Sequence, residues 1–274
     1  RARTVVHIHL DYSVDELRWA LRQPPDLIIA CARFMTASIE QAMPLSASPV
    51  VKAVVPNAVD LSCFATVDRR AARVRVGADP TTPLAMVIAN LSPHKGQETA
   101  IRAIAELARR GRRVDLWIVG EERGATEGPY TKRLRALSSD LGIAAQIRFQ
   151  GFRRDVPELL PAANFVLLPS TSEGMPLTLL EARAAGAIVI AAPTAGVPEI
   201  IEDNVDGFLV PHDDPQGYAE AMEAMLDNPE VAAEVSAIGK RRVQQRHSSE
   251  VFVADVFGLY EGLMARRMPG IRAA

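Results

Sequence analysis

The fold is decided by the stretch Pro169-Ser-Thr-Ser-Glu-Gly-Met-Pro-Leu-Thr-Leu-Leu-Glu-Ala-Arg-Ala-Ala-Gly186. The apolar run Asn164–Leu168 comes directly before it and predicts a short buried strand. The strand ends at Pro169, a loop of Ser, Thr and Gly carries Glu173, and a helix is predicted from Pro176, since proline is favoured at the start of a helix. The sequence therefore predicts a strand–loop–helix unit with a carboxylate in its loop.

Glu181 lies in the predicted helix at a position where an acidic side chain is unusual. Leu177, Leu180 and Ala184 share one helical stripe, and Glu181 falls inside that stripe. A buried carboxylate without a partner is costly, and helical side chains tilt toward the helix start, so Glu181 can approach Glu173 and the free backbone N–H groups there. Carboxylates for hydroxyl groups and a helix N-terminus for phosphate suit a polyhydroxylated anion, such as a sugar nucleotide.

Both carboxylates also have purely structural interpretations. Glu173 lies three residues before Pro176, so it could cap the following helix rather than meet a ligand. Glu181 could form an internal ion pair with an arginine that the sequence does not identify. Both alternatives stay open at this point.

The segment Ser172-Glu-Gly-Met-Pro-Leu-Thr-Leu-Leu-Glu-Ala-Arg-Ala-Ala-Gly186 resembles the E-x7-E motif of retaining family-4 glycosyltransferases of the GT-B fold. The resemblance runs from about Val5 to Leu226. Further segments resemble the family in the expected order: Val55-Pro-Asn-Ala-Val-Asp-Leu61, Asn90-Leu-Ser-Pro-His-Lys-Gly96, Trp117-Ile-Val-Gly120, Arg148-Phe-Gln-Gly-Phe152, Gly196-Val-Pro-Glu-Ile-Ile201 and Asp206-Gly-Phe-Leu-Val210. This resemblance implies an α/β protein of GT-B type, with two Rossmann-like lobes that hold parallel sheets, the first lobe being incomplete.

The resemblance also implies an activity. It implies a retaining, hexosyltransferase-type glycosyltransferase that moves a sugar from a nucleotide-diphosphate donor to an acceptor hydroxyl, with attack from the face of departure. The donor would be a UDP-, GDP- or ADP-sugar and the acceptor a carbohydrate or a lipid-linked molecule, and family members use no bound metal or other cofactor. Two alternatives stay open. A GT-B-fold sugar-nucleotide epimerase would need an acid/base group near the sugar, and a nucleotide-sugar-binding module would need no chemistry.

Lys95 and Gly96 end the loop that is similar to the family's phosphate loop. A lysine there can place a positive charge on a diphosphate, and glycine permits a close backbone approach, although such a lysine alone is usually a solvated helix start. The loop departs from the family at Asn90, where many members have an arginine, so a second positive charge is missing from this position. Arg153 or Arg154 is an alternative source of that charge.

The resemblance assigns further residues to the donor. Glu173 would orient the sugar, Glu181 would accept hydrogen bonds from the ribose, and Gly151 begins a turn similar to the one that meets the base, although any strand-to-helix turn tolerates glycine. The loop Gly120–Glu122 lacks the family's second glycine and is left out of the site. The predicted catalytic residues are Glu173, Lys95 and His9, and the predicted donor-binding residues are Asn90, Lys95, Gly96, Gly151, Phe152, Glu173, Gly174, Met175, Pro176, Leu177 and Glu181.

His7 and His9 lie on the same face of the predicted strand Thr4–His9. The family places a histidine of the first lobe against the donor sugar, and His9 at the strand end fits that position better than His7. A metal site built on the two histidines has no third ligand in sight, so no metal is predicted. The remaining alternative is a strand-end histidine bonded to the backbone.

Short apolar runs alternate with helical patterns along the chain, which predicts parallel strands joined by helical crossovers. The runs are continuous rather than alternating, which indicates sheets covered on both faces. The predicted strands are Thr4–His9, Leu27–Cys31, Val50–Val55, Leu84–Ala89, Val114–Val119, Gln146–Gln150, Asn164–Leu168 and Ala187–Ala191, and the clearest predicted helices are Glu98–Arg110, Tyr130–Leu141, Tyr218–Leu226, Val231–Gln245 and Val251–Arg267.

These elements predict a division into lobes. Residues 1–66 are expected to be the C-terminal part of the acceptor-side lobe, and residues 83–245 the nucleotide-sugar-binding lobe. Segment 67–82, rich in Arg, Ala, Asp, Thr and Pro, is the predicted linker. In the family a late helix returns to the first lobe, and residues 246–274 are expected to do so. Family members usually carry more sequence ahead of this point, so the chain is expected to be truncated.

Composition argues against several classes of partner. The 274 residues include 31 Lys and Arg and 33 Asp and Glu, and this near balance makes nucleic acid an unattractive partner. Cys31 and Cys63 are the only two cysteines, and the chain shows no secretory signal, which favours the reducing cytoplasm. No apolar run approaches the roughly 20 residues of a membrane span, which leaves peripheral contact at the inner face of the membrane.

Overall fold

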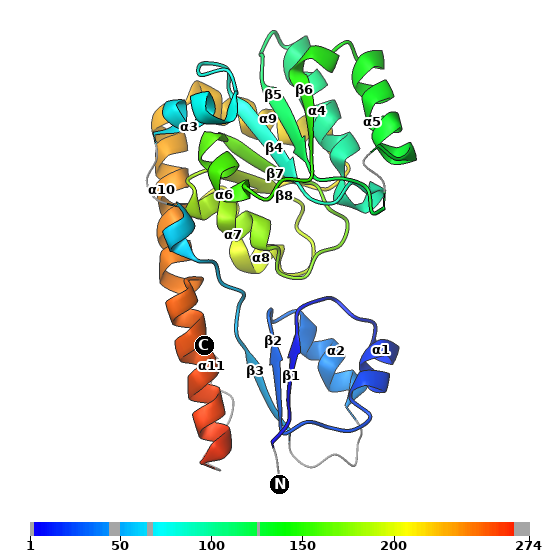
Figure 1. The fold of residues 1–274 in the computed structure, drawn as a ribbon, viewed down its shortest axis with the longest axis vertical. Coiled ribbons are helices and arrows are strands. Elements are labelled where there is room, and N and C mark those ends of the chain that lie inside the picture. Colours follow the sequence, from blue (N-terminus) through cyan, green and yellow to red (C-terminus); the bar gives the residue numbers. More distant parts are fainter. Residues whose placement is uncertain (1–2, 44–49, 65–67, 125–126, 266–274) are drawn as a thin grey trace.

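A computed structural model describes residues 3–43, 50–64, 68–124 and 127–265 of the chain. The described residues form two parallel β-sheets, one of three strands and one of six, each flanked by helices (Figure 1). The predicted α/β class with two parallel sheets is therefore confirmed.

The smaller sheet has the strand order β1-β2-β3, and both of its strand pairs are parallel. Successive residues of β2 enter different cores, because Ile28 packs toward the crossover helices while Leu27 and Ile29 pack toward a helix from the far end of the chain. The elements are β1 (Val5–Ile8), α1 (Val14–Ala20), β2 (Leu27–Ala30), α2 (Met35–Ala42), β3 (Val51–Val54) and the late helix α11 (Ser249–Met264).

The larger sheet has the order β6-β5-β4-β7-β8-β9, so the chain winds outward first on one side of β4 and then on the other. Apolar clusters lie on both faces, with Met86 in one and its neighbour Val87 in the other. The strands are β4 (Leu84–Ile88), β5 (Asp115–Val119), β6 (Ile147–Gly151), β7 (Phe165–Leu168), β8 (Ile188–Ala191) and β9 (Phe208–Leu209).

Helices of three to eighteen residues surround this sheet. The α-helices are α3 (Arg69–Val76), α4 (Gln97–Arg109), α5 (Pro129–Asp140), α6 (Val156–Leu159), α7 (Leu177–Ala184), α8 (Val197–Ile200), α9 (Pro215–Asp227) and α10 (Pro229–Arg246). The short 3₁₀ helices are η1 (Leu61–Phe64), η2 (Pro93–Lys95), η3 (Ala144–Gln146) and η4 (Leu160–Ala162).

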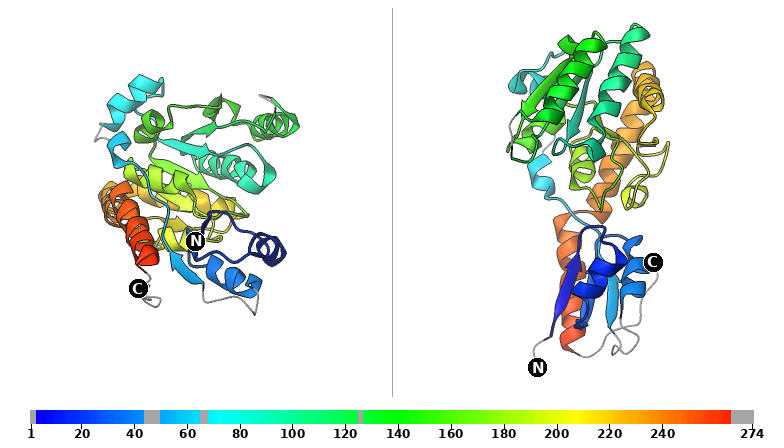
Figure 2. Two further views of the ribbon diagram at one scale, coloured as in Figure 1. Left: turned by 60° about the horizontal axis from the view of Figure 1, so that its bottom comes forward. Right: turned by 90° about the vertical axis from the view of Figure 1, so that its right-hand side faces the viewer.

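The chain passes between the two sheets in two places. One is the segment that follows β3, and the other is the junction of α10 and α11 at His247. The two passages are joined, since the Val59 N–H donates to the His247 carbonyl at 2.9 Å and Val59 pairs with Ser248 as an isolated bridge. Figure 2 shows α10 and α11 following one another along the molecule, and α11 contributes residues such as Val256 and Leu263 to the core of the N-terminal sheet.

The elements differ from the sequence prediction in three details. All eight predicted strands are present, but the two-residue strand β9 was not predicted. The segment 67–82, predicted as a linker, contains helix α3, which packs against η4. Leu177 does not belong to the buried stripe of α7, because 47% of its surface is exposed while Leu180 is fully buried. Within the described ranges, no helix combines the length and apolar character that a membrane crossing requires.

Candidate functional site between the two sheets

Loops at the carboxyl ends of strands from both sheets meet at one place, which is where ligands bind in open parallel α/β sheets. His9 follows β1, and the loop Glu173–Pro176 follows β7. The contact is close, because a Cβ atom added to Gly174 would lie 2.6 Å from the His9 carbonyl oxygen. Any other residue at Gly174 would push the two loops apart.

Lys95 and Glu173 form an ion pair at the edge of the larger sheet, with 2.7 Å between Nζ and Oε1. The two side chains are 21% and 9% exposed, so the pair is largely withdrawn from water. Lys95 is the last residue of η2, and Gly96 follows it with φ +69°. A Cβ atom at Gly96 would lie 2.0 Å from the Pro169 carbonyl oxygen, so this glycine lets the Lys95 loop pack against the loop of Glu173. The close approach that Gly96 permits is therefore to Pro169, whereas the sequence predicts an approach to a diphosphate.

The N-terminus of α7 has no side-chain cap among the described residues. Pro176 occupies the N-cap position in an extended conformation, so the helix begins at Leu177, one residue later than predicted. Glu173 does not take the capping role that was its structural alternative, because its Oε1 atom accepts a hydrogen bond from Lys95 instead. The backbone N–H groups at the start of α7 can therefore bind an anion.

Glu181 is half-buried in α7, and burial raises the pKa of its carboxyl above the usual value. Within the described part of the chain its carboxylate makes no ion pair, in contrast to the structural alternative from the sequence. The nearby Arg183 is 1% exposed and pairs with the fully buried Asp206. Glu181 thus offers an acceptor group for hydroxyl donors, and no cation among the described residues pairs with it.

His9 is exposed, and its Nδ1 atom lies 3.1 Å from Oδ1 of Asn57. The His7 ring stacks on it at a centroid distance of 6.0 Å, and Nε2 of His7 lies 3.0 Å from the Tyr260 hydroxyl. The pKa of His7 is lowered, mainly because the ring is partly buried and to a smaller extent because of the charge of the neighbouring His9. Across the described ranges no group of three His, Cys, Asp or Glu residues is arranged to hold a metal ion.

The remaining predicted donor residues lie at the same edge of the larger sheet: Asn90 and Phe152 on loops, Gly151 at the end of β6 and Leu177 at the start of α7. Asn90 is exposed, and its carbonyl accepts a hydrogen bond from the buried Gln97 at 3.0 Å. Phe152 is 60% exposed, directly after β6. Arg153, considered as a second phosphate ligand, is paired with Asp155 at 2.7 Å, so its charge is already engaged.

Two contacts between the sheets were not predicted from the sequence. The Glu199 carboxylate of α8 accepts the backbone N–H groups of Arg33 and Phe34, at 2.8 and 3.0 Å, and so holds the backbone that leads into helix α2 beside the smaller sheet. The Asn57 side chain donates to the Met175 carbonyl at 2.9 Å. The sequence signals for these two contacts are weak: Asn57 lies in the segment after β3, and Glu199 lies in the short helix α8.

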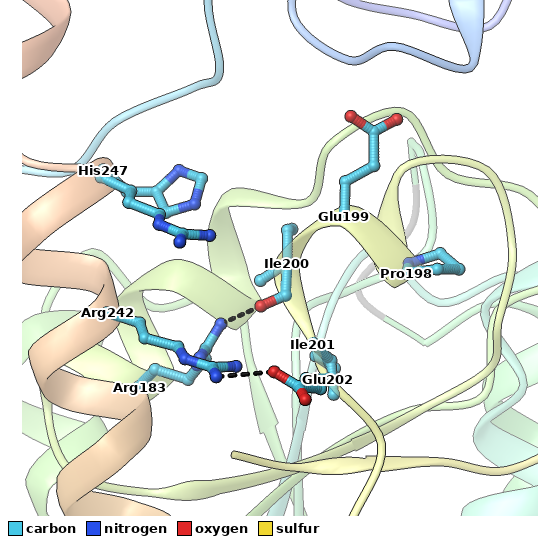
Figure 3. Close-up of a pocket in the computed structure, with 9 residues that line it drawn as sticks. Arg183, Pro198, Glu199, Ile200, Ile201, Glu202, Arg242 and His247 are labelled. Carbon is cyan, nitrogen blue, oxygen red and sulfur yellow. Dashed lines mark hydrogen bonds and ion pairs between the residues drawn. The ribbon is translucent and has the colours of Figure 1, made fainter. Parts of the chain in front are cut away.

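A cavity of about 440 Å³ lies beside Glu199, on the side of α10. Figure 3 shows Arg183 and Arg242 projecting into it, with the Glu199 carboxylate pointing away toward the other sheet. The arginines are engaged in the protein itself, since both bind Asp206 and Arg242 also binds Glu202 at 2.6 Å. In the cavity wall, Arg183 and Arg242 are therefore held in an ion-pair network with Asp206 and Glu202.

Comparison with known proteins supplies the family. The family model described as "Glycosyl transferases group 1" matches residues 68–242, well over half of the chain. The chain belongs to this family. The α/β fold with two parallel sheets is the GT-B fold that the E-x7-E segment implied.

Curated relatives share this part of the chain. The D-inositol 3-phosphate glycosyltransferase of Acidothermus cellulolyticus is 32% identical over 252 residues, covering 88% of this chain and 56% of that protein. The same enzyme of Saccharomonospora viridis is 33% identical over 228 residues, covering 80% of this chain and 52% of that protein. The chain thus spans about half the length of the curated relatives that it matches.

Among solved structures, Anabaena Alr3699/HepE in complex with UDP-glucose superposes on this group 1 glycosyltransferase chain with a TM-score of 0.82 and 25% identity. The match covers 94% of this chain and 72% of that one. The same protein in complex with UDP superposes with a TM-score of 0.84. Both sheets of the present chain are included at such coverage.

Proposed function

We propose that this chain carries the donor-binding part of a retaining glycosyltransferase, which moves a sugar from a nucleotide diphosphate to an acceptor hydroxyl. The observation that carries the proposal is the Lys95–Glu173 pair beside the uncapped N-terminus of α7. It brings a cation, a carboxylate and free backbone N–H groups together at the strand ends where ligands bind in this class of fold. The UDP-glucose complex of HepE supports the same class of donor.

Each group has a role that its environment supports. Lys95 and the N-terminus of α7 would hold the diphosphate and stabilise its charge as it leaves, in the manner of preorganised electrostatic catalysis. Glu173 would orient the sugar through hydroxyl groups. Glu181 would accept hydrogen bonds from the ribose, which suits a half-buried carboxylate without a cationic partner in the described chain. Gly151 and Phe152 would meet the base.

His9 would contact the sugar from the smaller sheet. Its exposed ring lies at the end of β1, and Gly174 packs against its carbonyl. We propose the lobe division 1–66 and 83–245, with the acceptor, a carbohydrate or lipid-linked molecule, bound on the side of the smaller sheet. The reaction would take place on the cytoplasmic side of the membrane.

Calorimetry tests donor binding directly. UDP, GDP, ADP and UDP-glucose are titrated into the chain, and one of the nucleotides is expected to bind with about −5 to −8 kcal/mol. Lys95→Ala is expected to weaken the free nucleotide and the sugar nucleotide alike, whereas Lys240→Ala on α10 serves as the matched control. No binding of any nucleotide would refute the assignment of the donor site.

Product analysis with a sugar nucleotide separates the three candidate classes. Transfer to an acceptor or slow donor hydrolysis, with the configuration at the anomeric carbon kept, is expected for the proposed enzyme. Conversion of the donor into an epimer would identify the epimerase alternative. Tight binding with no chemical change, in a chain joined to the remainder of the protein, would identify a binding module.

A further inference from the structure

Asn57 lies directly between the histidine of the smaller sheet and the donor loop of the larger one. Its Oδ1 atom lies 3.1 Å from His9 Nδ1, and its Nδ2 atom lies 2.9 Å from the Met175 carbonyl oxygen. Its own carbonyl oxygen lies 2.9 Å from Nδ1 of the buried His247. Asn57 therefore contacts β1, the donor loop and the α10–α11 junction at the same time.

The hydrogen-bond partners fix the orientation of the Asn57 amide. The Met175 carbonyl oxygen can only accept a hydrogen bond, so the atom facing it must be the NH₂ group of Asn57. The opposite orientation would place two oxygen atoms 2.9 Å apart with no proton between them. The side-chain oxygen Oδ1 of Asn57 must then face His9, while the backbone carbonyl oxygen of Asn57 faces His247.

The orientation of the amide in turn fixes the protonation of His9. An amide oxygen can only accept, so Nδ1 of His9 must carry the proton that it donates to Asn57. In the neutral ring the lone pair is then on Nε2. In the described part of the chain no residue forms a hydrogen bond with Nε2 of His9, whose ring is exposed.

We infer that Asn57 is a positioning residue for His9: it holds the Nδ1–H tautomer, so that Nε2 accepts a hydrogen bond from a hydroxyl group of the donor sugar. The inference rests on the proposed function for its second half, because it assigns the donor sugar to His9. The first half, the tautomer, concerns only Asn57 and His9.

The surrounding contacts keep Asn57 in place for this role. Its backbone N–H lies 3.2 Å from the Met175 sulfur, and the His247 carbonyl accepts the N–H of Val59 two residues later. Gly174 next to Met175 packs against the His9 backbone. The His9 ring and the donor loop are thus held by the same amide, so the direction of Nε2 is coupled to the loop that carries Glu173.

The decisive experiment is nitrogen NMR of the histidine rings in the folded chain. Long-range proton–nitrogen correlation spectra distinguish a protonated ring nitrogen from one with a lone pair, and His9→Gln identifies the His9 signals. At a pH where the ring is neutral, we expect His9 to be protonated on Nδ1. A wild-type spectrum with the proton on Nε2 would overturn the inference outright, with no variant required.

Two substitutions distinguish the effect of the Asn57 oxygen, which accepts from His9, from the effect of its NH₂ group, which donates to Met175. Asn57→Ala removes the acceptor, and His9 is expected to shift toward the Nε2–H form, which free imidazole side chains favour. Asn57→Asp keeps an acceptor oxygen opposite His9 and is expected to keep Nδ1–H, although it loses the bond to the Met175 carbonyl. An unchanged His9 tautomer in Asn57→Ala would show that Asn57 only clamps the two sheets.

Ligand binding tests the second half. Asn57→Ala is expected to weaken UDP-glucose relative to UDP by about 2- to 12-fold, which corresponds to the loss of one neutral hydrogen bond. Asn228→Ala, whose amide donates to the Ala224 carbonyl between α9 and α10, is the control and should alter neither affinity. Equal weakening of UDP and UDP-glucose would exclude contact between His9 and the sugar. If the wild type binds neither ligand, the proposed function fails, while the tautomer result stands by itself.

Discussion

Glu173→Gln is the substitution that tests the site most sharply, because it removes a charge and keeps the shape. The Glu173 carboxylate forms an ion pair with the Lys95 ammonium at 2.7 Å. A diphosphate that binds Lys95 must share the ammonium with this carboxylate or displace it. On the proposed function, the carboxylate would therefore compete with the phosphates while assisting the sugar.

The magnitude follows from the burial of the pair. Exposed ion pairs contribute about 0–1 kcal/mol, and breaking a fully buried pair costs about 3–5 kcal/mol. Because the Lys95 and Glu173 side chains are 21% and 9% exposed, we expect Glu173→Gln to lower the free energy of unfolding by about 1–3 kcal/mol. Free UDP, relieved of the competing charge, should bind about 3- to 10-fold more tightly, or about 0.6–1.4 kcal/mol.

The assay is a double-mutant cycle measured by calorimetry with UDP. Lys95→Ala should weaken UDP by about 1.5–3 kcal/mol, the range for a hydrogen bond to a charged group. Adding Glu173→Gln to Lys95→Ala should change nothing further, since the competing pair no longer exists, and Glu234→Gln on the exposed face of α10 is the control. If Glu173→Gln alone weakened UDP as strongly as Lys95→Ala does, the carboxylate would support the phosphate loop and would not be a group reserved for the sugar.

The remaining predictions concern single carboxylates and thiols. Burial raises the pKa of Glu181, so its ionisation lowers the stability of the fold at pH 7 but not well below its usual pKa of 4.5. Glu181→Gln should therefore raise the melting temperature at pH 7 and leave it unchanged near pH 3.5. A constant difference in melting temperature at all pH values would contradict this. Asp206→Ala should cost about 3–5 kcal/mol in denaturant unfolding, because it leaves a buried guanidinium unpaired, whereas the exposed Asp213→Ala should stay within about 0.5 kcal/mol. Burial raises the pKa of Cys31 to about 11, so at pH 8 only the exposed Cys63 should react rapidly with a disulfide reagent, and fast labelling of both thiols in the folded chain would refute the burial.

The fold was predictable from the sequence because its strands are short continuous apolar runs. Leu84–Ile88 and Phe165–Leu168 are buried on both faces of the sheet, so no polar residue interrupts them. Strand β9 was not predicted because two residues are too few to show a pattern of hydrophobic periodicity. Helix α3 was not predicted because four of its eight residues are arginines. One of them, Arg73, is buried, and its guanidinium donates hydrogen bonds to Ala162 of η4 and to Asn164.

The sequence suggested individual residues for the candidate site, and their roles stay predictions; it did not predict the ion pair between Lys95 and Glu173. Lys95 and Glu173 are 78 positions apart. The loops that carry them meet through the packing of Gly96 against Pro169 and the hydrogen bond from the Thr171 N–H to the His94 carbonyl. Arg183 lies two residues after Glu181 in the sequence, yet its side chain pairs with Asp206. In the sequence, Asp206 indicates only the resemblance to the family. Such choices depend on the side of a helix that faces the core, and α7 has buried residues at five of its eight positions.

The division of the site between two sheets determines which measurements are informative. Lys95, Glu173 and the start of α7 all belong to the larger sheet, so on the proposed function a free nucleotide would require only that sheet. The sugar would in addition meet His9, whose position depends on contacts that cross between the sheets, namely the amide of Asn57 and the packing of Gly174. Affinity for the nucleotide alone therefore reports the phosphate site, and the difference between sugar nucleotide and nucleotide reports how the two sheets are held together. A variant that changes this difference while leaving the nucleotide affinity unaltered acts through the junction between the sheets, wherever in the chain it lies.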